Sequence, residues 1–244
     1  MKNEKQYTEG ISIEENKFLK WFDNYWYHHK WLTIGIAFAL VVILVCTIQT
    51  CTKEKEDITV LYAGPYHLNT EQYYAVSNIL DGILPEDYDG DGAKNVLLSR
   101  YHIYSREQIE EITSTVDETG KNGFVDLNNN TNQYDAYSNY LLTGESSVLF
   151  LDPWLYKELR DNGNGVLMNL SEVFDDLPEN VINDYGILLK DTEMYKEYAV
   201  IRDIPENTVI CLLRPIIGGK SYKAENYEIE KAMFAAITGV EVKN

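Results

Sequence analysis

Cysteine is scarce in this chain, and its placement excludes a disulfide framework. The 244 residues contain three cysteines. Cys46 and Cys51 lie in or beside a hydrophobic run, which leaves Cys211 as the only cysteine in the remainder. A single cysteine cannot form an internal disulfide, and no C-x-x-C pair is present for zinc or redox chemistry. Cys211 stands within the apolar sequence VICLL, so we expect a buried thiol in a strand.

Recognisable catalytic motifs are also lacking. Neither G-x-S-x-G nor H-E-x-x-H occurs, and after the hydrophobic run the only histidines are His67 and His102. The sequence Gly219-Lys220-Ser221 resembles the end of a phosphate-binding loop, but Arg214 stands where that motif requires its first glycine. These absences favour a non-catalytic protein. The alternative is a hydrolase or transferase of the cell envelope that uses carboxylates in its loops.

Positive charge is in short supply, and the deficit is confined to one part of the chain. Lysine and arginine total 21 against 39 aspartates and glutamates, for a formal net charge of −18. Residues 1–51 contain five lysines and five acidic residues, so the whole negative charge falls on residues 52–244. An acidic domain repels phosphate backbones and anionic head groups, which excludes nucleic acid as its partner.

One long hydrophobic run is present. Trp31–Ile48 is uncharged over eighteen residues, which as a helix would extend about 27 Å and cross a bilayer. The thirty residues before it exceed the charged leader of a cleaved signal peptide, so a retained anchor is favoured. Lysines near the run place the N-terminus in the cytoplasm and the acidic domain outside. A cysteine-poor exported domain suits a Gram-positive bacterium.

The predicted organisation therefore has four parts. Residues 1–30 form a cytoplasmic segment with an aromatic juxtamembrane helix, 31–50 the transmembrane helix, 51–56 a linker and 57–244 the extracellular domain. Apolar runs predict strands at 58–63, 95–104, 147–151, 198–202 and 208–214. Apolar spacing and caps predict helices at 70–84, from 105, at 132–142, after 152 and at 226–238, with a long loop at 117–130. This alternation predicts a single layered α/β domain with a mostly parallel sheet flanked by helices.

An acidic stretch after the first predicted helix of the domain resembles the start of a calcium loop. Asp87, Asp89 and Asp91 alternate and are followed by Gly92, as in the first six positions of an EF-hand loop. Position eight is Lys94 instead of an apolar residue, and position twelve is Leu98 instead of a bidentate carboxylate. The three aspartates are candidate calcium ligands. The alternative is an acidic turn that leads from the helix into the next strand.

Two stretches resemble bacterial extracellular solute-binding proteins. One is the opening strand ITVLYAGP with its following helix, and the other is LLTGESSVLFLDPWLYKELRDNGNGVLMNLSEVF. In the second, the family's G-x-L-x-x-L-s pattern is matched by Gly165, Leu167, Leu170 and Ser171. The resemblance covers residues 57–215 and implies an α/β lobe of the periplasmic-binding type. Residues 186–244 leave no room for the family's second lobe, so the resemblance implies one lobe without a closing cleft.

The expected function is that of a membrane-anchored extracellular binding or accessory module. Without a closing cleft, it would act by contacting a partner such as a transporter or another membrane protein. Nineteen tyrosines are present and could line a carbohydrate or peptide surface; the alternative is that they occupy ordinary half-buried helix positions. The candidates are Tyr73, Tyr74, Tyr134, Tyr137, Tyr140, Tyr195 and Tyr198.

Overall fold

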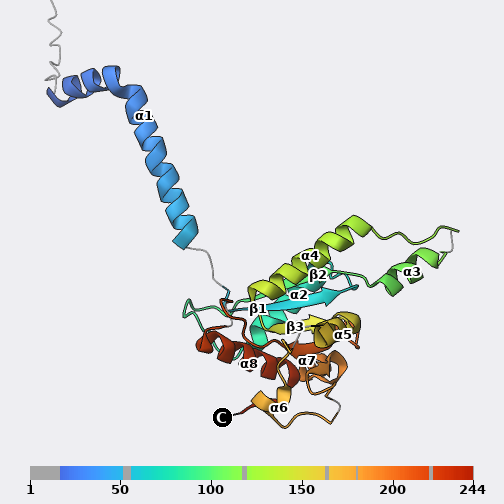
Figure 1. The fold of residues 1–244 in the computed structure, drawn as a ribbon. Helices are drawn as coiled ribbons and strands as arrows, with labels where there is room; N and C mark the ends of the chain where they lie inside the picture. Colours follow the sequence, from blue (N-terminus) through green and yellow to red (C-terminus); the bar gives the residue numbers. More distant parts are fainter. Residues whose placement is uncertain are drawn as a thin grey trace, which may run out of the picture. The chain divides into compact units, whose positions relative to one another are not determined.

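A computed structural model describes residues 17–51, 56–116, 120–162, 165–179, 181–219 and 222–243 (Figure 1). The contacts within the chain divide it into two compact units, residues 1–53 and residues 54–244. Each unit is described by itself.

The first unit contains one long helix, α1 (Lys17–Cys51). Its stretch Trp21–Ile48 is long and apolar enough to cross a membrane, and none of its most apolar window is buried in the protein. Such a helix suits a membrane anchor or a signal sequence. Near its beginning, aromatic side chains four residues apart meet on the helix surface. Trp21 stacks on Tyr25 and Phe22 on Trp26, with ring centroids 5.7 and 6.1 Å apart.

The second unit is built on a five-stranded sheet with the order β2-β1-β3-β6-β5. The strands are β1 (Ile58–Gly64), β2 (Val96–His102), β3 (Val148–Leu151), β5 (Gly186–Leu188) and β6 (Val209–Leu212). Strand β1 pairs in parallel with β2 and β3, whereas β6 pairs antiparallel with both β3 and β5. Four of the five strands therefore run in the same direction, and the predicted mostly parallel α/β sheet is confirmed.

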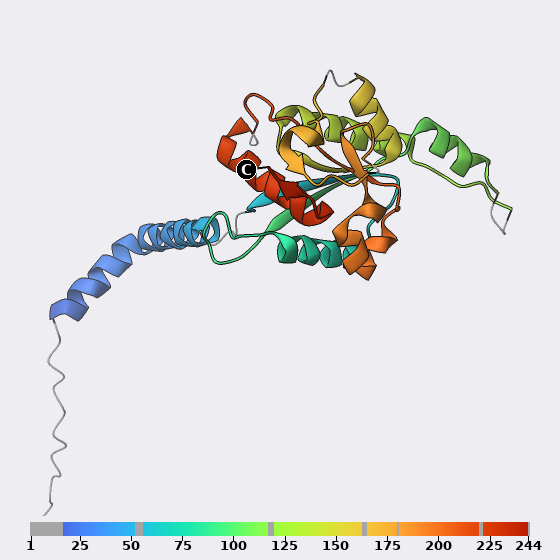
Figure 2. The same cartoon turned by 90° about the horizontal axis from the view of Figure 1, so that it is seen from below.

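Helices cover both faces of this sheet, which explains why its central strands are continuously apolar (Figure 2). Every residue of β1, β3 and β6 is buried, including Cys211, as expected from the sequence. Helices α2 (Thr70–Ile83) and α8 (Ala224–Thr238) pack on one face. Helices α4 (Leu127–Thr143) and α5 (Pro153–Asn162) pack on the other.

Shorter elements complete the unit. They are α3 (Arg106–Ser114), α6 (Leu170–Val173), β4 (Phe174–Asp175), η1 (Leu189–Asp191), α7 (Glu193–Glu197), η2 (Ala199–Asp203) and β7 (Glu241–Val242). Strands β4 and β7 form a separate antiparallel pair. The capping box predicted at the start of α3 is present, because Ser105 and Gln108 each accept a hydrogen bond from the backbone N–H of the other.

Two predicted elements were wrong. Residues 198–202 do not form a strand but enter the 3-10 helix η2, in which the Ile201 N–H donates to the Tyr198 carbonyl and the Ile201 side chain is fully buried. The run YAVI is apolar because it includes a buried turn of helix, and not because it forms a strand. Of the predicted loop at 117–130, residues 117–119 lie outside the described residues. The described part ends early, because Asp126 caps α4 by accepting from the backbone N–H groups of residues 128 and 129.

Strand β5 was not predicted, and Gly186 is the reason. Glycine usually weakens a strand, so the run Gly186–Leu188 does not have the pattern of one. Here the glycine permits close packing: a Cβ added to it would lie 2.5 Å from Cγ1 of Val209 and 3.1 Å from the Tyr156 ring. The absence of a side chain lets β6 and α5 approach this strand together.

Candidate functional site

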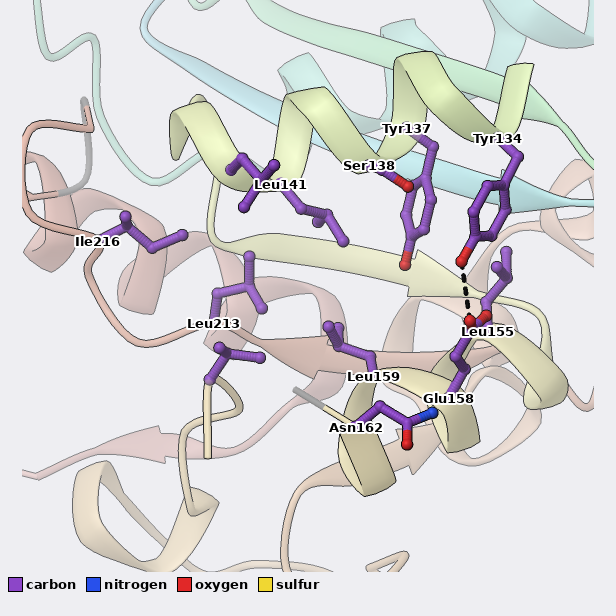
Figure 3. Close-up of a pocket in the computed structure, with 12 residues that line it drawn as sticks. Tyr134, Tyr137, Ser138, Leu141, Leu155, Glu158, Leu159, Asn162, Leu213 and Ile216 are labelled. Carbon is purple, nitrogen blue, oxygen red and sulfur yellow. Dashed lines mark hydrogen bonds between the residues drawn. The ribbon is translucent and has the colours of Figure 1, made fainter. Parts of the chain in front are cut away.

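A groove between α4 and α5 has a volume of about 380 Å³ (Figure 3). It is lined by Tyr134, Tyr137, Ser138, Leu141, Leu142, Leu155, Glu158, Leu159, Asn162, Val166, Leu213 and Ile216. Among these described residues, most are apolar and only Glu158 carries a formal charge. An apolar groove with a few placed polar groups is the usual chemistry of a binding site.

A tyrosine and a glutamate form the polar end of this groove. The Tyr134 hydroxyl donates a hydrogen bond of 2.8 Å to Oε1 of Glu158, seen as the dashed line in Figure 3. Burial, followed by the Glu158 carboxylate, raises the pKa of Tyr134, so this hydroxyl remains a donor at neutral pH. The ring of Tyr134 also stacks on Trp154, with centroids 6.3 Å apart. The hydrogen bond to Glu158 and the stacking on Trp154 together fix the position of the Tyr134 side chain.

Helices α4 and α5 pack on the same face of the sheet, and apolar side chains lie at the rim of the groove between them. At the opposite end of the groove from Tyr134, Leu142 is 75% exposed, although it is a leucine in the last turn of α4. Gly144 then ends α4 in a left-handed conformation, and Gly219 packs so closely on it that a Cβ would lie 2.9 Å from the Gly144 backbone. This contact fixes the loop that carries Ile216 against the end of the helix.

The acidic loop lies between α2 and β2, as predicted, where β2 begins. The Asp87 carboxylate accepts hydrogen bonds of 2.8 Å from the backbone N–H groups of Gly90 and Gly92. Asp89 accepts from the Asp91 N–H, and Asp91 accepts from the residue 93 N–H. The bonds from the backbone of Gly92, foremost, and of Gly90 lower the pKa of Asp87. The aspartates thus hold the turn by bonding its backbone.

An aspartate outside the motif joins this loop. Asp57 precedes β1, and its carboxylate accepts from the N–H groups of Tyr88, Asp89 and Asn95 at 2.7, 3.0 and 2.9 Å. Oxygens of Asp57, Asp87 and Asp89 lie within 4.8 Å of one another, whereas Asp91 is not in this group. Asp57 lies thirty residues before the motif, so no spacing rule connects it to the loop.

The two positions that depart from the calcium motif have structural contacts. The Lys94 ammonium donates to the carbonyls of Leu84 and Pro85, at 2.8 and 3.1 Å, just beyond the C-terminal end of α2. Leu98 lies in β2 and is 5% exposed, packed in the core. Neither residue offers a carboxylate to a cation. Beside the loop, a hollow of about 260 Å³ has the described carboxylates of Glu56, Asp57, Asp89, Glu145 and Glu230 in its lining.

The two histidines of the second unit lie together at the C-terminal end of β1 and β2. His67 and His102 have ring centroids 5.3 Å apart, and Nε2 of His102 lies 2.7 Å from the Pro65 carbonyl oxygen. Burial, opposed by the bond to Pro65, lowers the pKa of His102. A hollow of about 230 Å³ adjoins them and is also lined by Arg100. The pair was not predicted to meet, because the histidines lie on separate elements.

No known protein family, no curated protein and no solved structure matches this chain. Of the sites described, the groove between α4 and α5 combines the largest volume with an exposed apolar rim.

Proposed function

We propose that this chain is a non-catalytic binding or accessory module, anchored in the cell membrane by α1 with its N-terminus in the cytoplasm and residues 57–244 outside the cell. The outer part would be a single layered domain that resembles one lobe of a solute-binding protein. It would bind another membrane protein, such as a transporter, through the groove between α4 and α5. The length and composition of α1 support the anchor.

The observation that carries this proposal is the groove itself. Its lining is apolar, its rim exposes Leu142, and its polar end presents one carboxylate whose Oε1 is already bonded to Tyr134. Apolar side chains of a partner would be buried along the groove, while Oε2 of Glu158 would face a lysine or arginine. The net charge of −18 also favours a basic partner.

Two leucines of α4 provide a matched test. Leu142 lines the groove and is 75% exposed, whereas Leu127 lies at the other end of the same helix, outside the groove, and is 59% exposed. A photoreactive phenylalanine would replace each in the full chain in its own cells. We expect one dominant crosslinked protein from position 142 and none from position 127. Equal crosslinking at both positions, or none at either, would contradict the proposal.

The alternative is a cell-envelope hydrolase or transferase, and the carboxylate-lined hollow beside the acidic loop favours it. An enzyme of this kind would need at least two carboxylates facing one space. The test is release of soluble fragments from purified cell walls by the full chain. Activity that is lost in Asp89→Asn and retained in Asp135→Asn, an exposed position on α4, would establish the enzyme and displace the binding module.

A further inference from the structure

Strand β2 is an edge of the five-stranded sheet and pairs with β1 alone among the described strands. The direction of its peptide groups follows from the bonds at its ends. The N–H of Ile103 donates to the Gly64 carbonyl and therefore faces β1. Successive residues of a strand alternate, so the peptide groups of Leu98, Arg100 and His102 face away from β1. Three successive peptide groups thus line the outer side of this strand.

The outward peptide groups just before and just after these three are hydrogen-bonded to side chains of other elements. The carboxylate of Asp81 accepts from the Val96 N–H at 2.6 Å. At the other end, the Asn130 amide both accepts from the Tyr104 N–H at 2.8 Å and donates to the Tyr104 carbonyl at 3.1 Å. An amide that makes both bonds reproduces what a neighbouring strand would supply. Within the part of the chain that the structure describes, no such partner meets the backbone groups of residues 98, 100 and 102.

Two usual protections of an edge strand, a lysine or proline in its sequence and a bulge, are missing from β2. Its sequence, VLLSRYH, contains no lysine, proline or glycine, and its pairing with β1 runs without a bulge from residue 96 to 102. Arg100 is the one charged side chain that could shield the edge. Its guanidinium instead donates to the Leu68 carbonyl and lies 4.4 Å from the centroid of the Tyr73 ring. The side chain that could block a new strand is therefore held by α2 and the loop before it.

Apolar side chains flank the edge on its two sides. Leu97 is 43% exposed on the side of the sheet that α4 partly covers, and Tyr74, next to Tyr73 on α2, is 61% exposed. A segment that paired with β2 would direct alternate side chains toward these two residues.

We propose that the free edge of β2 binds an extended segment of a partner protein, which adds a sixth strand to the sheet. Three outward peptide groups pair with about five residues of such a segment, since strand bonds recur at every second residue. The occupant carries lysine or arginine among apolar residues, because the net charge of −18 on this chain attracts a basic segment and repels a second copy. The edge is separate from the groove between α4 and α5, so the experiment on one surface can give a negative result while the experiment on the other gives a positive one.

Proline provides a matched pair of variants. In Arg100→Pro the outward N–H is removed while the ladder to β1 is kept, because residue 100 does not donate toward β1. In Arg100→Ala the side chain is removed but the N–H remains. Both variants would be prepared as the full chain in nanodiscs and compared with wild type by circular dichroism. Loss of binding in the proline variant only would assign binding to the backbone of β2.

The probe is a displayed library of random nine-residue peptides, selected on the wild-type full chain. We expect basic, alternating sequences whose affinity falls at least about tenfold in Arg100→Pro and less than about twofold in Arg100→Ala. Methylation of single backbone nitrogens in a selected peptide should weaken binding at every second position. This second measurement uses the wild-type chain and remains decisive if the proline variant does not fold.

Four results would overturn the proposal. They are a selection without binders, binders that the proline substitution does not affect, an N-methyl scan without a period of two, and a wild-type dimer that Arg100→Pro dissociates. The last result would assign the edge to a second copy of the chain.

Discussion

Removing the Asp57 carboxylate should destabilise the second unit far more than removing any single exposed aspartate of the acidic loop. Asp57 accepts three backbone hydrogen bonds, from Tyr88, Asp89 and Asn95. Two of these bonds are partly buried and one is exposed. At about 1 kcal/mol for each partly buried bond and somewhat less for the exposed one, Asp57→Ala should cost about 2–3 kcal/mol. For a unit of this size the melting temperature would fall by roughly 4–12 °C.

Asp91→Ala is the control for this variant. Asp91 accepts one exposed bond from the residue 93 N–H, so its loss should cost about 0.5 kcal/mol or less. Thermal unfolding of the full chain in nanodiscs, followed by near-ultraviolet circular dichroism, would compare the two. Melting temperatures of the two variants within about 2 °C of each other would refute the assignment of three stabilising bonds to Asp57.

The same melts in calcium and in EGTA address the calcium hypothesis for Asp87, Asp89 and Asp91. If Asp57 acts through its hydrogen bonds, the deficit of Asp57→Ala is the same in both buffers. A calcium site would instead make the wild-type melting temperature rise with calcium, because the cation binds the folded loop. A cation held partly by Asp57 would also make the deficit of Asp57→Ala larger in calcium than in EGTA.

Two further predictions concern pH and packing. The pKa of Asp87 is lower in the folded chain than its ordinary value of 3.8. The ionised Asp87 carboxylate therefore stabilises the fold above pH 3.8, and this stabilisation is lost as the pH falls through the lower pKa of the folded chain. In urea titrations at several pH values, Asp87→Asn should make the free energy of unfolding fall less steeply toward acid pH. Gly186→Ala should destabilise by about 1–3 kcal/mol, because its Cβ would overlap Val209, whereas Gly82→Ala in α2, which meets nothing within 4 Å, should stabilise by about 0.4–1 kcal/mol in the same assay.

Much of the fold was readable from local patterns. The runs that became β1, β3 and β6 are continuously apolar because helices cover both faces of the sheet, and this pattern distinguishes them from edge strands. The capping box at Ser105 and the glycine after α8 also marked the helix ends correctly, since both depend on residues three or fewer positions apart.

What was missed depends on residues distant in sequence. The direction of β6 is set by how the chain returns to the sheet, and a strand has the same apolar pattern in either direction. The groove was missed because the spacing of Tyr134, Leu141 and Leu142 on α4 is the same whether a helix face is covered or open. The bond from Asn130 to Tyr104 and the bonds of Asp57 join segments about 26 to 38 residues apart, so no short motif contains them.

Strand β6 has a consequence for the order in which the chain can acquire its structure. It comes from the last fifth of the sequence, yet it lies between β3 and β5 and is the neighbour of both. A growing polypeptide that ends before Val209 therefore has β3 exposed along one side, with no hydrogen-bonding neighbour there. The first half of the unit must remain incomplete until residues 209–212 have been synthesised. Chaperones that bind exposed strands would accordingly have the most time to bind β3 during this interval.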